Sequence, residues 1–143
     1  MASDNSWVNI EKQLIDRLKS SLPTGITLAM VKMPNADFTT PTGSGAKWIR
    51  LAINGLQPTD LDAAGACELT PGICTIDVFV AKTSGSIAAM TAAQHIKNLY
   101  NGYRFDDLVV TSVAVLPRGE DGNWYRVQVD INFEFQSYDS TIV

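Results

Sequence analysis

Few residues in this sequence have the types and spacing that catalysis requires. His95 is the only histidine, and as a general base it would need a partner that the sequence does not supply. The stretch Thr42–Lys47 contains two glycines and a lysine, but it lacks the spacing of a phosphate-binding loop and no helix is predicted after it. We therefore interpret His95 as a partly exposed helix residue, and we predict neither an enzyme nor a cofactor site.

Acidic residues offer the next chemistry to consider, because hard cations such as calcium bind oxygen-rich loops. They form three groups in predicted loops or turns. The first group is Asp60, Asp62 and Glu68, the second is Asp106 and Asp107, and the third is Glu120 and Asp121. Neither the first nor the last group has the spacing of a calcium-binding loop, and the middle pair is explained by a polar turn before a strand. We predict solvated loop charges and no metal site.

Two cysteines, Cys67 and Cys74, lie seven positions apart, a spacing that could bracket a hairpin and bring the sulfur atoms together. A disulfide and two free thiols are both open, and a reducing cytoplasm favours free thiols. A zinc site needs about four ligands, which these two residues and His95 do not provide.

Large aromatic and charged residues share one face of two predicted strands. Trp48 and Arg50 lie opposite the apolar side of the strand Lys47–Asn54, and Trp124 and Arg126 lie on the polar side of the last strand. Exposed aromatic side chains among charges indicate a contact surface. The alternative is that helices cover part of this face. Trp7, by contrast, is predicted to lie in the core.

Composition is typical of a small globular protein. The chain has 143 residues, 45% of them hydrophobic, which predicts one domain over residues 1–143. The net charge is -4 and no basic block is present, so tight nucleic-acid binding is not expected. The sequence shows no membrane span and no secretory signal, and we expect a soluble protein made in the cytoplasm.

Hydrophobic periodicity predicts two helices and five strands. One amphipathic helix has Trp7, Ile10, Leu14, Leu18 and Leu22 on its apolar stripe, and a second spans Ile87–Asn101. The predicted strands are Ile26–Met33, Lys47–Asn54, Ile73–Ala81, Leu108–Leu116 and Tyr125–Phe135. Loops are expected at Pro34–Gly45 and Gly55–Gly72, with a hairpin connection at Pro117–Asn123. The predicted fold is α+β, with a mixed, mostly antiparallel sheet of about five strands and two helices on one face.

Four segments, in this order, resemble the tail terminator (tail completion) proteins of long-tailed bacteriophages. They are Pro34–Gly43, Trp48–Leu51, Gly72–Val80 and Gly122–Val129. The resemblance implies a virion protein that forms a hexameric ring at the head-proximal end of the tail, after assembly in the host cytoplasm. Its implied partners are copies of itself, the tail tube protein and a head-completion or connector protein. DNA would pass through the ring without specific binding, and no membrane is involved.

The residues that we expect to make assembly contacts lie in the long loop, on the shared strand face and in the last hairpin. They are Phe38, Thr39, Thr40, Thr42, Trp48, Arg50, Arg118, Glu120, Asp121, Trp124 and Arg126. Another neck component, such as a head-completion protein, is an alternative structural role. A small ligand-binding domain or enzyme that uses the acidic loops is an alternative of a different class.

Overall fold

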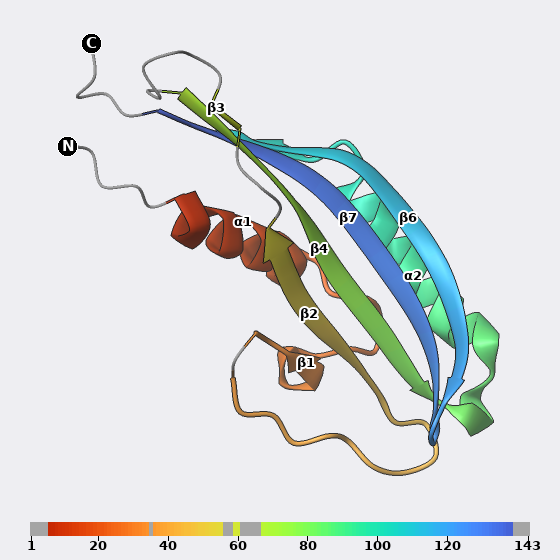
Figure 1. The fold of residues 1–143 in the computed structure, drawn as a ribbon. Coiled ribbons are helices and arrows are strands. Elements are labelled where there is room, and N and C mark those ends of the chain that lie inside the picture. The colour runs from red at the N-terminus through yellow and green to blue at the C-terminus, as the bar shows by residue number, and fades with distance from the viewer. Residues whose placement is uncertain (1–5, 35, 56–58, 61–66, 139–143) are drawn as a thin grey trace.

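A computed structural model describes residues 6–34, 36–55, 59–60 and 67–138 of the chain. It contains the two predicted helices and a curled sheet (Figure 1). The helices are α1 (Ser6–Ser20) and α2 (Ser86–Tyr100), with short 3-10 turns at η1 (Leu28–Met30) and η2 (Lys82–Ser84). The strands are β1 (Val31–Lys32), β2 (Lys47–Gly55), β3 (Thr59–Asp60), β4 (Cys67–Ala81), β5 (Arg104–Phe105), β6 (Leu108–Asp121) and β7 (Trp124–Tyr138).

The sheet is built on four long strands, β2, β4, β7 and β6, which pair in that order and are all antiparallel. Three two-residue strands extend it: β1 lies parallel beside β2, β5 pairs with β6, and β3 pairs with β4. The sheet is therefore mixed but mostly antiparallel. The predicted α+β fold with two helices is confirmed, and the strands number more than the five expected because the short ones carry no periodic pattern.

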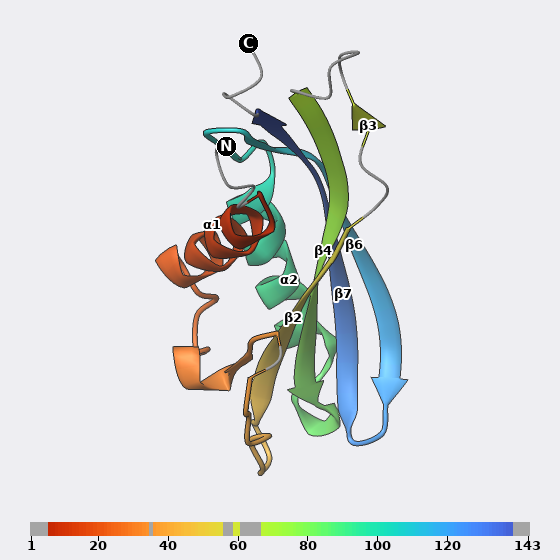
Figure 2. The ribbon, with the colours of Figure 1, turned by 60° about the vertical axis from the view of Figure 1, so that its left-hand side comes forward.

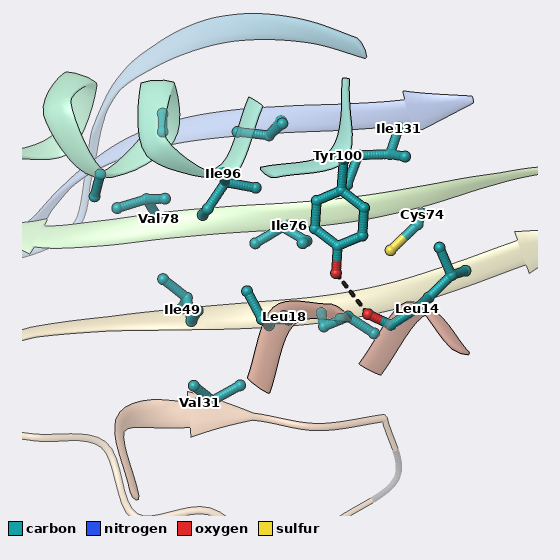
Figure 3. Packing of buried hydrophobic residues seen from close by; sticks show 14 of the residues in the cluster. Leu14, Leu18, Val31, Ile49, Cys74, Ile76, Val78, Ile96, Tyr100 and Ile131 are labelled. Carbon is teal, nitrogen blue, oxygen red and sulfur yellow. Dashed lines mark hydrogen bonds between the residues drawn. The ribbon is translucent and has the colours of Figure 1, made fainter. Parts of the chain in front are cut away.

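Both helices pack on the same face of the sheet, which we call the helix-covered face (Figure 2). Alternation along β7 directs Val127, Val129 and Ile131 towards this face, where each is completely buried. Helix α2 contributes its alanine-rich stripe and Ile96, and α1 contributes Ile10, Leu14 and Leu18. Figure 3 shows Leu14, Leu18, Ile96 and Ile131 among the side chains that meet between the helices and the strands.

One buried hydrogen bond ties the two helices together. The Tyr100 hydroxyl at the end of α2 donates to the Leu14 carbonyl oxygen of α1 at 2.6 Å (Figure 3). Burial raises the pKa of Tyr100 well above its usual range, which keeps the hydroxyl protonated and able to donate. The bond therefore fixes α1 against α2 at the centre of the core.

Several predicted element boundaries are wrong. Only Val31 and Lys32 of the predicted strand Ile26–Met33 pair with the sheet, and residues 28–30 form a 3-10 turn. The expected loop Gly55–Gly72 instead contains the start of β4, because Pro71 and Gly72 lie within that strand. The connection predicted at Pro117–Asn123 is mostly strand, with the turn confined to Gly122 and Asn123.

The prediction that Trp7 of α1 lies in the core is also wrong, because this residue is 43% exposed. Its ring lies against Gly55 at the end of β2, where a Cβ atom would collide with it.

The cysteines do not bracket a hairpin. Cys67 and Cys74 lie on the same strand, β4, so about 3.4 Å of extended backbone per residue keeps them too far apart for a disulfide within one chain. Cys74 is a free, fully buried thiol on the helix-covered face. Burial raises its pKa well above the usual range, which makes it chemically inert in the folded protein.

Candidate functional site

The opposite face of the sheet carries no helix of the described chain, and we call it the helix-free face (Figure 2). Register places three of the predicted contact residues, Trp48, Arg50 and Arg126, in two adjacent rows on this face. Trp48, Phe79 and Arg126 lie opposite one another across β2, β4 and β7, and Arg50, Asp77 and Gln128 form the next row. Because paired residues point to the same side of a sheet, these six side chains share one surface.

Aromatic and charged side chains gather at the end of this face nearest the turn between β6 and β7. We call this cluster the hairpin-end patch. It consists of Phe38, Trp48, Arg50, Asp77, Phe79, Asp121, Trp124 and Arg126.

The aromatic half of the patch is centred on Trp48. Its ring stacks on Phe79 with centroids 4.1 Å apart, and Trp124 meets it edge-on at 6.1 Å. Phe38, from the loop after β1, packs against it at 5.3 Å. Aromatic pairs of this kind contribute about 0.5–1.5 kcal/mol each beyond the area they bury. They therefore hold the long loop against the sheet.

The charged half is centred on Asp77, which is only 5% exposed although none of the described helices covers it. The Arg50 guanidinium donates two hydrogen bonds to Asp77 Oδ2, at 2.8 and 3.3 Å. Arg126 approaches the other carboxylate oxygen at 3.6 Å and also reaches Asp121 at 3.6 Å. One buried carboxylate thus holds two arginines flat on the sheet. Arg50 in addition lies over the Phe79 ring, which joins the two halves of the patch.

Polar side chains extend this network along the sheet. The Gln128 amide oxygen accepts hydrogen bonds from Arg118 at 3.0 Å and from Arg126 at 3.4 Å. The Gln128 amide nitrogen donates to Asp130 at 2.7 Å, and the Thr75 hydroxyl donates to the same Asp130 oxygen at 3.1 Å. Side chains held this way lose less conformational entropy when a partner binds.

Not every buried polar atom of the patch has a hydrogen-bond partner in the described chain. Trp48 Nε1, Asp77 Oδ1 and Arg126 Nε are buried and unsatisfied, although the last two lie within ion-pair distance of each other. An unsatisfied buried group costs about 1–3 kcal/mol. The patch is therefore organised at some cost in stability.

The structure changes the expected exposure of the tryptophans. Trp48 is 8% exposed, so the prediction that it is an exposed strand residue is wrong. The alternative, cover by a helix, is also wrong, because Phe38, Phe79 and Trp124 provide the cover. Trp124 is half-buried.

The other predicted contact residues surround the patch. Thr39, Thr40 and Thr42 are exposed in the loop that carries Phe38. Arg118 and Glu120 lie at the end of β6, where Glu120 pairs with Lys82 at 3.7 Å.

Sequence reasoning missed Asp77 and Phe79 as members of the site. The signal was present in Asp77, the one charged residue in the apolar run Ile73–Ala81. A buried carboxylate in such a strand requires cationic partners.

Catalytic chemistry finds little support in this arrangement. His95 Nε2 lies 2.8 Å from the Ser21 carbonyl oxygen and joins α2 to the end of α1. The shallow hollow beside it is lined by Ile87, Met90, Thr91, Gln94 and Asn98, with no carboxylate. Within the described ranges, no group of three or more His, Cys, Asp or Glu residues could hold a metal ion. No described helix is long and apolar enough to cross a membrane.

Comparison with known proteins supplies the identity of the family. The family model described as "Phage tail terminator protein" matches residues 9–133, which include most of α1, all of α2 and most of the sheet. Curated proteins yield no match. One matching solved structure superposes with a TM-score of 0.66 over 98% of this chain and 99% of its own, at 21% identity, and this likeness supports the fold alone. The chain therefore belongs to the phage tail terminator protein family, and it is a structural protein of a phage tail.

Proposed function

We propose that this protein forms a ring that caps the head-proximal end of the tail tube, ends tube polymerisation and provides the surface to which the head joins. The observation that carries the proposal is the match of the tail terminator family over residues 9–133. The partners in this proposal are further copies of the chain, most simply six, the tail tube protein and a head-completion or connector protein.

The size and charge of the chain are compatible with such a ring. A compact chain of 143 residues has a diameter of about 37 Å, and six touching spheres leave a central hole as wide as one sphere. This hole admits duplex DNA. Each copy carries a net charge of -4, so an acidic ring would let DNA pass without holding it.

The hairpin-end patch is the surface that we propose for contact with a neighbouring virion protein. Arg50 and Arg126 are fixed by Asp77 yet remain 38% and 26% exposed, so their guanidinium groups can still bind a partner. Arginine and aromatic residues are the types enriched at the centres of protein interfaces. The exposed threonines of the adjoining loop and the charged hairpin end, with Arg118 and Glu120, would form the rim.

A mechanical mechanism follows from a ring with two different faces. One face docks on the last layer of the tube, and the other presents no surface on which a further tube layer can assemble. Termination then requires only binding, and we propose no catalytic step and no cofactor.

The test is a mass measurement across a concentration series, with and without purified tail tubes, combined with negative-stain imaging. A species six times the 15.5 kDa chain, seen as a ring with a central hole or as a cap on added tubes, would support the proposal. A protein that stays monomeric and leaves tube ends bare would overturn it. Binding to filled heads but not to isolated tails would instead identify another neck component.

A further inference from the structure

Strand β6 has an open edge along its middle. Its outer side pairs with β5 only at Leu108 and Val109, and Val110 donates its N–H to the Tyr103 carbonyl oxygen. Beyond this point, no described residue pairs with the outer side of Ser112–Leu116. These five residues are uncharged and lie between two bulges, at Thr111 and Arg118.

Strand β2, at the opposite edge of the sheet, is open over a segment of the same length. The parallel strand β1 pairs with it only at Ile49 and Arg50. In the described chain, nothing pairs with the outer side of Leu51–Gly55, which is again five uncharged residues.

Open strand edges are normally protected in soluble proteins, because they pair readily with other chains. The usual devices, proline, charge and bulges, flank the open segment of β6 at Pro117 and Arg118 but are absent within it. The open segment of β6 is therefore bounded by these devices but is itself free to pair, as expected of an edge that pairs with a defined partner.

We propose that the open edge of β6 in one copy pairs with the open edge of β2 in the next copy, and that this pairing is the lateral joint of the ring. The inference rests on the proposed function, since it supplies the joint that the ring needs. Two different patches that bind head to tail produce a closed ring when the rotation closes.

Strand direction agrees with this joint. The order β2, β4, β7, β6 is antiparallel throughout, so β2 and β6 run in opposite directions. Rotation about a ring axis preserves the direction along that axis, and β6 therefore meets the next β2 antiparallel. The alternation of strands would continue without interruption from copy to copy.

The hydrogen-bonding groups also point the required way. Along an antiparallel pair, backbone groups alternate between the two sides of a strand. The Ala81 N–H donates to the Ala46 carbonyl oxygen, so the backbone groups of Ala46 point towards β4. Counting along β2 from this residue, the backbone N–H and C=O groups of Leu51 and Ile53 point to the open side. In β6 the Val110 N–H points outward, because it donates to Tyr103. The bulge at Thr111 inserts one residue, so beyond it the backbone groups of Val113 and Val115 point outward.

On the helix-free face, small residues lie near the middle of both open segments. A shift of one residue between the paired strands would turn every side chain of one strand to the other face of the sheet. Only pairings that differ by an even number of residues therefore keep the helix-free faces of two copies continuous. Ala114 of one copy then lies opposite Ala52 of the next or, with a two-residue stagger, opposite Asn54. All three belong to the helix-free face, and in β-pairs that lack hydrogen bonds the Cα atoms are about 4.5 Å apart, which a disulfide can bridge.

Cysteine cross-linking tests the joint. In a Cys67→Ser background, we would combine Ala114→Cys with Ala52→Cys or with Asn54→Cys, and use Ala114→Cys with Ala88→Cys as the matched control. Ala88 is an exposed alanine on α2 and belongs to neither edge strand. After mild oxidation of the assembled protein, one of the two test pairs should form a reducible ladder that ends at the size of the ring. The control pair and each single variant should stay uncross-linked.

The outcomes separate this inference from the proposed function. Rings or tube caps that form normally while neither test pair cross-links would overturn the joint and leave the ring standing. A single Ala114→Cys variant that forms dimers with itself would also overturn it, because the contact would then be symmetric. Absence of any ring or cap in the unmodified protein would instead contradict the proposed function.

Discussion

The two faces of the same sheet are built in opposite ways. On the helix-covered face, Val127, Val129 and Ile131 of β7 are completely buried beneath α1 and α2. On the helix-free face of the same strand, Arg126 and Gln128 belong to a network of ion pairs and hydrogen bonds around buried Asp77. The first face is closed by its own chain, whereas the second leaves two fixed arginines accessible to a partner.

The difference shows that the two faces contribute differently to the stability of the fold. Apolar contacts on the helix-covered face provide the free energy of folding. A buried ion pair, by contrast, is weak evidence for stability, because desolvation offsets much of the attraction between the charges. The cost of the Asp77 cluster is better explained by the orientation that it gives to Arg50 and Arg126.

The largest expected effect is on the helix-covered face. Phe133 is 1% exposed and its ring fills the space beside Gly72, so Phe133→Ala should lower the free energy of unfolding by about 3–5 kcal/mol. Its neighbour Glu134 is exposed, and Glu134→Ala should change it by less than about 0.5 kcal/mol. Urea unfolding measures both, and equal losses would break the distinction between the faces.

A smaller loss is expected at the centre of the patch. Asp77→Asn keeps the shape but removes the charge that holds Arg50 and Arg126, and it should cost about 1–3 kcal/mol. The control is Asp121→Asn, whose side chain is 57% exposed, with a loss below about 1 kcal/mol. If thermal unfolding shows Asp77→Asn to be neutral, the carboxylate does not organise the patch.

Arg126→Ala should sharpen the comparison, because it removes a proposed contact residue without opening the core. Asp77 keeps its hydrogen bonds to Arg50, so the stability should fall by less than about 1 kcal/mol. Ring formation or tube capping should nevertheless be lost. Arg104→Ala, an exposed arginine outside the patch, is the matched control. A folded Arg126→Ala protein that assembles like the control would show that Arg126 is not a contact residue.

The smallest effect concerns the thiol of Cys74. Since burial raises its pKa, thiol reagents should not label Cys74 in the folded protein even at mildly alkaline pH, and labelling should appear only in denaturant. The same shift means that the unfolded chain releases this proton first. The free energy of unfolding should therefore decline as the pH rises above the ordinary thiol pKa of 9.0. Rapid labelling under native conditions would contradict the closed core.

Sequence periodicity predicted the parts of the fold in which one face is buried. Strand β7 alternates apolar and polar residues along most of its length, and both helices have clear apolar stripes, so their positions were correctly predicted. The start of β4 was missed because Pro71 normally argues against a central strand. The last residue pair between β2 and β4 is Gly55 with Gly72. Pro71 lies one residue beyond this pair, so its missing N–H removes no hydrogen bond between β2 and β4.

The site was predicted in part. Alternation placed Trp48, Arg50, Trp124 and Arg126 on one face, and the structure brings them together. Their burial depends on cross-strand neighbours such as Phe79, which only the register between strands reveals. The partners and the ring depend on contacts between chains, which the residue pattern of one chain does not reveal.

The most direct test of the central claim is the length distribution of tail tubes polymerised with and without this protein. The account predicts that added protein binds one end of each tube and stops its growth, so that incubation with further tube protein no longer lengthens it. Tubes that continue to grow at the same rate in excess of this protein would contradict it.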